Sequence, residues 1–467
     1  MKTKVIPSSW LRRGGRRFDC NPYLLGGLEA RLRLEELDVR KDELQEVTRG
    51  GIDGIYHAGR EGRTWVLDEK LGVRFLSSSR VMAADYSSLP LLSAQQVQSN
   101  PAFRIHRGWT LITRSGTIGR MVHARPDMDG MACSEHVMRV VPDTNEIAPG
   151  YMYAFLRSKF GVPMVVSGTY GSIIQSIEPR HLADLPVPRF GEGFESRVHG
   201  LIEESAELFS DYQAGVVKAT EEFFESVGLS DITAAQWHKS GPDVGFTQNF
   251  PRVESFRALN FNPRFKALCE RIRQGPWKPL AEICVPGTLK RGARFKRVDA
   301  EPEHAYQLVG QKQLFWLRPE GRWIARWAVG DEVLVEPGTI LMAAIGTLGE
   351  TELYCRTEFI WGPATERAYS ENIVQVVGDA AVMPRGCLYA FMRSETTFRM
   401  LRSISVGTKN QLHHKRLLAQ LPVPYPDSLA QEQVQKTMTT AYDARHRGVA
   451  LEEEAIALVE AAIEEAS

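Results

Sequence analysis

Cysteine is scarce in this chain of 467 residues, and no two cysteines form a CxxC pair. The wide spacing argues against a zinc ribbon and against a dense disulfide framework. The six residues are Cys20, Cys133, Cys269, Cys284, Cys355 and Cys387. We expect them to be reduced thiols.

Long apolar runs are also missing. No stretch approaches the roughly 18 consecutive apolar residues that span a bilayer, and the opening MKTKVIPSSWLRRGGRR lacks the apolar core of a secretory signal. With 43% hydrophobic and 24% charged residues, the composition is typical of a folded protein. The length favours two or more domains, because a domain usually has about 150 residues. We therefore expect a folded cytoplasmic protein with several cores.

A net charge is absent, since 57 basic residues balance 57 acidic ones. The chain as a whole therefore lacks the positive electrostatic potential that would indicate a polyanionic partner. The charges are nevertheless segregated along the sequence. Basic residues cluster at 12–17, 290–297 and 409–416, whereas glutamates concentrate at 203–225 and 452–465.

Recognised catalytic motifs are absent as well. The sequence contains no GxxxxGK[ST] phosphate loop, no GxGxxG after a strand, no GxSxG elbow and no HExxH. His413 and His414 are adjacent, so they cannot share one face of a regular element as paired metal ligands do. We expect a non-catalytic chain that holds no metal and no cofactor of its own.

What the sequence does contain is an internal repeat. The segment 132–188 aligns with 368–424 without a gap, with 23 identities in 57 positions. Upstream, GWTLITRSGTIG (108–119) matches GTILMAAIGTLG (338–349), and the stretch between this block and the next is six residues longer in the second copy. A weaker match relates FDCNP (18–22) to LNFNP (259–263).

Each copy is followed by a stretch whose apolar residues recur every three or four positions, as on one face of a helix. A helix of about 33 residues spans roughly 50 Å, more than packing within one small domain requires. The two helices could each pack on their own domain, pair with each other or bind a partner chain. The bodies of the copies mix short strands and helices, which predicts an α+β fold. The predicted segments are 1–190, a helix in 191–228, a linker at 229–256, 257–426, and a helix in 427–467.

Two duplicated features could contact a ligand. Gly116 and Gly119, like Gly346 and Gly349, predict a tight hairpin in each copy, either purely structural or with phosphate-binding backbone amides. Further on, TYGSIIQSIEPR (169–180) and SVGTKNQLHHKR (405–416) share a frame but differ in polar residues. This is either how two homologous modules would read two different ligands, with side chains of the kind that bond to base edges and phosphates, or drift in an exposed loop.

The order of these motifs resembles the DNA specificity subunit of type I restriction-modification systems. The motifs are GxxLIxRSGTIG, SEHxxxVxP, YxYxFLRS, GxxxQxxxxxxLxxLPVP and then a long helix, twice over, within 17–227 and 257–466. FDCNPYL (18–24) resembles the family's opening motif, and LAQEQVQKTM (429–438) resembles the start of its helix. The first copy lacks the corresponding glutamine after PVPRFGEGFES, and Ile345 replaces the serine found at Ser115.

The resemblance implies two homologous target recognition domains in tandem, each reading one half of a split site in double-stranded DNA. The long helices would form an antiparallel coiled-coil-like spacer. Chemistry would belong to partner subunits: methyltransferase subunits that bind S-adenosylmethionine, and a motor or nuclease subunit that uses ATP.

The residues predicted to contact DNA are polar or basic and lie in the duplicated loops or the basic clusters. They are Arg74, Arg114, Ser115, Thr169, Tyr170, Ser172, Gln175, Lys290, Arg291, Arg294, Lys296, Arg297, Thr408, Lys409, Asn410, Gln411, His413 and Lys415. Two alternatives remain. One is a nuclease that uses dispersed carboxylates such as Asp127, Asp129, Glu135 and Glu371, and the other is a scaffold that binds only protein.

Overall fold

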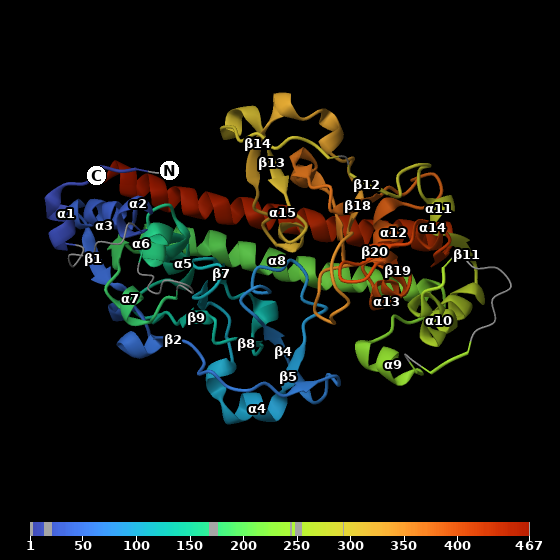
Figure 1. The fold of residues 1–467 in the computed structure, drawn as a ribbon. Helices are drawn as coiled ribbons and strands as arrows, with labels where there is room; N and C mark the ends of the chain where they lie inside the picture. Colours follow the sequence, from blue (N-terminus) through green and yellow to red (C-terminus); the bar gives the residue numbers. More distant parts are fainter. Residues whose placement is uncertain are drawn as a thin grey trace. The chain divides into compact units, whose positions relative to one another are not determined.

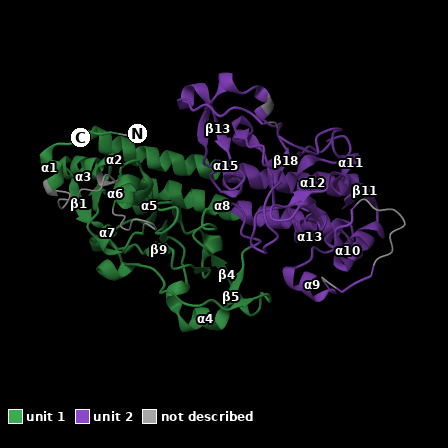
Figure 2. Cartoon of the chain, viewed as in Figure 1, with its two compact units in different colours: residues 1–83, 89–210, 447–467 green, residues 84–88, 211–446 purple. Residues whose placement is uncertain are grey.

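The structure is a computed structural model, and it describes residues 3–13, 21–167, 176–242, 245–247, 255–292 and 294–466. The chain divides into two compact units (Figure 2). Unit 1 comprises Met1–Ala83, Leu89–Ser210 and Arg447–Ser467, and unit 2 comprises Ala84–Ser88 and Asp211–His446. No helix within the described residues is long and apolar enough to cross a membrane.

Two long helices match the predicted positions (Figure 1). They are α8 (Glu192–Ser226), with 35 residues, and α15 (Ser428–Glu465), with 38 residues. The units do not follow the predicted segments, because each unit includes part of both helices. The helices are therefore structural members of both units.

Unit 1 is built on a four-stranded antiparallel sheet with strand order β2-β9-β6-β7, and a second sheet has the order β3-β5-β4-β8. Its strands are β1 (Arg40–Glu43), β2 (Ile55–Tyr56), β3 (Trp65–Val66), β4 (Gly72–Leu76), β5 (Leu91–Ser93), β6 (Thr110–Thr113), β7 (Met121–His123), β8 (Ala132–Cys133), β9 (Val137–Val140) and β10 (Pro186–Arg189). Its other helices are α1 (Ser8–Arg13), α2 (Asn21–Leu24), α3 (Gly27–Glu36), α4 (Ala94–Ser99), α5 (Pro149–Arg157), α6 (Gly161–Ser167) and α7 (Arg180–Ala183).

The core of unit 1 lies between this first sheet and the helices. All four residues of β6 and all four of β9 are buried, so both faces of these strands are covered. Ile112 and Met138 of the sheet pack in one cluster with α5, with Val198 of α8 and with Val459 of α15. Burial of these apolar side chains is what holds the long helices to the unit.

Unit 2 contains an antiparallel sheet with the order β12-β18-β15-β16 and a second sheet β14-β13-β17. Its strands are β11 (Trp277–Pro279), β12 (Lys290–Arg291), β13 (Ala305–Val309), β14 (Arg322–Ala325), β15 (Ile340–Ala343), β16 (Thr357–Phe359), β17 (Ala368–Tyr369), β18 (Ile373–Val376), β19 (Ser405–Val406), β20 (Leu412–His413) and β21 (Pro422–Pro424). Its other helices are α9 (Ala234–Lys239), α10 (Pro263–Arg273), α11 (Leu280–Ile283), α12 (Arg385–Met392), α13 (Glu395–Ser403) and α14 (Lys415–Ala419).

The strand pairings of the two units correspond residue by residue. Thr110 pairs with Val140 in unit 1, and Ile340 pairs with Val376 in unit 2. The alignment of the two copies equates the members of these pairs, Thr110 with Ile340 and Val140 with Val376. The parallel pairs show the same agreement, because Phe75 lies opposite Ala132 and Leu308 opposite Ala368. The repeat in the sequence is therefore also a repeat in sheet order and register.

Within unit 2 the two long helices contact each other, and later residues of α8 contact earlier residues of α15. The rings of Tyr212 and Tyr442 meet edge to face, with centroids 5.2 Å apart. Further along α8, the carboxylate of Glu222 accepts a hydrogen bond from the Thr437 hydroxyl at 2.7 Å. In unit 1 the Ser205 hydroxyl of α8 donates to the carbonyl of Gly448 in α15, also at 2.7 Å.

The predicted tight hairpin forms in the first copy but not in the second. Residues 114–120 connect β6 to β7, with positive φ angles at Gly116 and Gly119. In the second copy, residues 344–356 connect β15 to β16, six residues more than in the first copy. The prediction was wrong there because the six extra residues lengthen the turn itself, so Gly346 and Gly349 do not need a left-handed backbone.

Candidate nucleic-acid interface

The loop that carries the predicted contacts of the second copy is a small hairpin between β19 and β20. Gly407 begins its tip with φ 104°, a conformation that favours glycine, and Thr408, Lys409 and Asn410 are exposed. The backbone amide of Gln411 donates to the carbonyl of Gly346 at 2.8 Å. This bond joins the hairpin to the long connection 344–356.

Gln411 itself does not face outward. Its side chain is only 4% exposed, and its amide group donates to the carbonyl of Thr408 within the same hairpin. A glutamine in this position closes the turn and cannot reach a base edge without opening it. The predicted contact between Gln411 and DNA does not fit this geometry, whereas Lys409 and Asn410 remain available.

His413 is also turned into the protein. Its ring packs against that of Tyr354, tilted by 31° with centroids 4.9 Å apart, and its Nε2 lies 3.3 Å from the Sγ of Cys355. Burial lowers the pKa of His413 to about 3, so the ring is neutral at physiological pH. A neutral, enclosed imidazole is a poor phosphate ligand, and His413 is better explained as a support for the hairpin. Lys415, at the start of α14, is exposed.

The basic cluster at 290–297 separates into two kinds of residue. Arg291 donates to the carbonyl of Glu371 at 2.9 Å, and Arg297 forms an ion pair with the Glu371 carboxylate at 2.7 Å. Both of these guanidinium groups hold the start of β18. Lys290 and Lys296 are exposed, as is Arg294. These exposed cations suit phosphate contacts, which position a protein on DNA without reading its sequence.

In the first copy, the structure places Arg114 inside the module. Its side chain is 12% exposed, pairs with Glu178 and donates to the carbonyl of Ile177 at 2.9 Å. The Ser115 hydroxyl lies 2.6 Å from His136 Nδ1. Arg74 is exposed on β4. The predicted contacts at Thr169, Tyr170, Ser172 and Gln175 lie outside the described residues.

The carboxylates of the nuclease alternative already have partners. Asp127 receives two hydrogen bonds from Arg125, at 2.9 and 2.8 Å, and Asp129 lies 3.1 Å from His106. Glu135 pairs with Arg63, as Glu371 does with Arg297. Within the described part of the chain, no three His, Cys, Asp or Glu residues are grouped to hold a metal ion. The geometry therefore gives these carboxylates structural roles.

The sequence reasoning missed two exposed tryptophans beside arginines in unit 2. Trp327 is 80% exposed and Trp323 39% exposed. They lie next to Arg322 and Arg326 in sequence, and the Arg326 guanidinium stacks on Tyr306, 5.2 Å from the ring centroid. The segment RWIARW (322–327) carries a detectable signal, because alternating basic and aromatic residues are typical of nucleic-acid surfaces.

No protein-family model matches the chain, and no curated protein matches it. Among solved structures, it is similar to the S subunit of a type I restriction-modification system from M. genitalium, with 12% identity, 92% of this chain and 95% of that chain covered, and a TM-score of 0.34. It is also similar to the HsdS subunit from Thermoanaerobacter tengcongensis, with 13% identity, coverage of 91% and 96%, and a TM-score of 0.27.

A third similar structure comes from work on complex assembly and conformational transition of the type I restriction-modification system. It has 14% identity, coverage of 91% and 97%, and a TM-score of 0.26. All three TM-scores are low, so these similarities do not by themselves assign a function to the chain.

Proposed function

We propose that this chain is the DNA specificity subunit of a type I restriction-modification system, which reads a bipartite site in double-stranded DNA. The observation that carries the proposal is the repeat of sheet order and register, combined with the different sequences of 169–180 and 405–416. Two modules with one framework and different polar residues at equivalent positions are suited to reading two different half-sites.

In this proposal the modules are 1–190 and 257–426, and the linker is 229–256. The helices in 191–228 and 427–467 form an antiparallel coiled-coil-like spacer between the target recognition domains. The contacts of Tyr212 with Tyr442 and of Glu222 with Thr437 support the antiparallel pairing. At a rise of 1.5 Å per residue, helices of 35 and 38 residues extend about 53 and 57 Å.

The proposed DNA surface of the second module combines exposed tip residues with exposed cations. Lys409 and Asn410 are placed to contact base edges, and Lys290, Arg294 and Lys296 to contact phosphates. An asparagine that forms two hydrogen bonds with adenine contributes about 1–3 kcal/mol of discrimination. Arg114, Arg291, Gln411 and His413 support the modules from within instead, whereas Arg297 is exposed and forms its ion pair with Glu371 at the surface.

Catalysis is proposed to reside in partners. Methyltransferase subunits with S-adenosylmethionine would modify the DNA, and a motor or nuclease subunit with ATP would complete a restriction complex in the cytoplasm. Glutamates on α8 and α15 give these helices surfaces better suited to protein partners than to DNA.

Selection from a pool of DNA duplexes with long randomised blocks tests the proposal. The full chain, alone or with methyltransferase subunits of a type I system, is expected to enrich two fixed blocks separated by a spacer of constant length and variable sequence. Failure to enrich any sequence in either form would favour the protein scaffold, and cleavage of the duplexes by the isolated chain would favour the nuclease.

A further inference from the structure

The segment predicted to be a linker makes ordered contacts with the second module. The carboxylate of Asp231 accepts hydrogen bonds from the backbone amides of Glu395 and Thr396, at 2.9 and 2.8 Å, and so caps the N-terminus of α13. Just beyond it, Thr233 and Gln236 form a capping box that starts α9. These bonds fix the first part of the linker in place.

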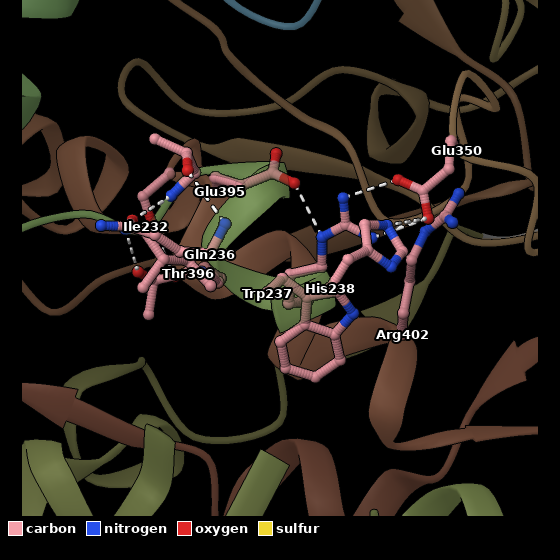
Figure 3. Close-up of polar contacts among 12 residues, drawn as sticks. Ile232, Gln236, Trp237, His238, Glu350, Glu395, Thr396 and Arg402 are labelled. Carbon is pink, nitrogen blue, oxygen red and sulfur yellow. Dashed lines mark hydrogen bonds and ion pairs between the residues drawn. The ribbon is translucent and has the colours of Figure 1, made fainter. Parts of the chain in front are cut away.

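The next contacts connect the linker to the long connection 344–356. Trp237 is buried, and the guanidinium group of Arg399 lies 5.8 Å from its ring centroid. Arg399 binds both carboxylate oxygens of Glu350, at 2.8 and 2.6 Å. His238 approaches the same carboxylate, with Nε2 3.3 Å from Oε1 (Figure 3). Glu350 therefore connects the linker and α13 to residues 344–356.

The first residues after the predicted linker meet the 407–411 hairpin directly. The Arg257 guanidinium donates to the carbonyl of Gly407 at 2.6 Å. The buried Asn260 amide donates to the carbonyls of Ser403 and Ser405, at 2.7 and 3.0 Å, on either side of the turn into β19. Residues before and after the predicted linker's central part thus contact both elements: Trp237 and His238 on the side of the connection 344–356, and Arg257 and Asn260 on the side of the hairpin.

The first copy lacks the arginines that make these contacts in the second copy. In the alignment of 132–188 with 368–424, Arg399 and Arg402 correspond to Pro163 and Val166. In the second copy, Arg402 donates to the carbonyls of Leu348 and Gly349, both at 2.7 Å. The two copies therefore support their turns differently, by packing at Val166 in one and by arginine bonds in the other.

From these contacts we propose that residues 231–238 and 257–260 position the recognition surface of the second module, through Glu350 and the 407–411 hairpin, and so set the accuracy with which one half-site is read. This inference rests on the proposed function. The side chains involved touch no DNA base; they act by fixing the backbone that presents Lys409 and Asn410. A rigid support of this kind is needed because a base contact loses its discrimination when the contacting group is displaced.

The test compares Glu350→Ala and His238→Ala with two matched controls in the same segments. Glu352→Ala removes an exposed carboxylate from the same connection, and Lys239→Ala removes an exposed charge from the same short helix. The full chain, with its methyltransferase subunits if these are needed for binding, selects from the randomised duplex pool described above. Glu350→Gln is included because it retains an acceptor oxygen for Arg399.

Glu350→Ala and His238→Ala are expected to reduce discrimination about tenfold in one half-site and to leave the other half-site unchanged. That half-site should be the one that Lys409→Ala alters. Glu350→Gln should recover part of the loss, and both controls should match the wild type. Hydrogen exchange should accelerate at 344–356 and 407–411 in the alanine variants, with thermal midpoints close to those of the controls.

Unchanged discrimination in both halves, with only a lower thermal midpoint, would overturn the inference and make the linker contacts purely stabilising. Equal loss in both halves would also overturn it. If the wild-type chain selects no bipartite sequence, both the proposed function and the inference fail. If the wild type selects a bipartite sequence and the variants select it equally well, only the inference fails.

Discussion

Gly215 in α8 provides a direct test of how closely the two long helices approach within unit 2. A Cβ atom built on Gly215 would lie 2.7 Å from the Cβ of Ala441 in α15, closer than two carbon atoms can pack. The Ala441 Cβ is attached directly to the helix backbone, so it cannot move aside as the end of a long side chain would. Gly215→Ala therefore forces the helices apart or strains them.

Two effects of opposite sign decide the outcome. Alanine is favoured over glycine in a helix interior by about 1 kcal/mol, which alone would stabilise the variant. Forcing an extra carbon into a close contact costs about 1–3 kcal/mol. The steric cost is expected to exceed the gain in helix propensity, so Gly215→Ala should lower stability.

Gly200 is the matched control in the same helix. A Cβ atom at Gly200 meets nothing within 4 Å, so Gly200→Ala gains the helix propensity without a clash. Urea denaturation followed by circular dichroism should show a lower midpoint for Gly215→Ala and a higher midpoint for Gly200→Ala. A rise of equal size in both variants would refute the close helix contact and the spacer built on it.

Three further predictions concern charged groups. Glu203→Gln should lower the unfolding midpoint at pH 7 but not near pH 2. The hydrogen bond from His123 is the main cause that lowers the pKa of Glu203 from 4.5 to about 2, so the stability that this carboxylate contributes is fully present above pH 4.5 and is lost as the pH falls through 2. An equal effect of the substitution at both pH values would contradict this. Lys296→Ala should weaken binding to all duplexes alike and reduce the slope of log affinity against log salt by about 0.9, with fluorescence anisotropy as the assay, whereas an unchanged slope would remove Lys296 from the phosphate surface. Asp85→Asn should destabilise the chain by about 1.5–3 kcal/mol, since the carboxylate pairs with Arg393, whose side chain is 5% exposed, at 2.5 Å; a neutral effect in thermal unfolding would show that other groups satisfy this guanidinium.

The framework of the fold could be predicted because it is duplicated. The gapless alignment of 132–188 with 368–424 already equates Val140 with Val376, and the sheets pair these residues in equivalent positions. The periodicity of the apolar residues likewise located both long helices. The extra length between Ala343 and Thr357 was visible as an insertion, but the sequence did not reveal that the turn itself takes up all of it.

The site was harder to predict, because polar residues have several uses. Gln411 was predicted to read a base, yet its side-chain amide donates to the carbonyl of Thr408 within its own hairpin. Arg114 and Arg291 looked like DNA contacts, but they bind carbonyl and carboxylate groups of the modules themselves. Residue type alone does not distinguish these roles, since tertiary contacts decide them.

The linker illustrates the same limit. Gly241, Pro242, Gly245 and Pro251 predict a linker, and the described residues of 229–256 contain one short helix, α9. The preceding contact through Asp231 depends on Glu395, at the start of a helix much further along the chain. No local pattern could have predicted that pairing.

The most direct test of the proposed function is genome-wide methylation mapping with the full chain and its methyltransferase subunits, comparing the wild type with a variant that combines Lys409→Ala and Asn410→Ala. The wild type should direct methylation to one bipartite sequence. The variant should relax specificity in one half of that sequence and leave the other half and the spacer length intact. An unchanged target, or loss of specificity in both halves together, would contradict the proposal that each module reads its own half-site.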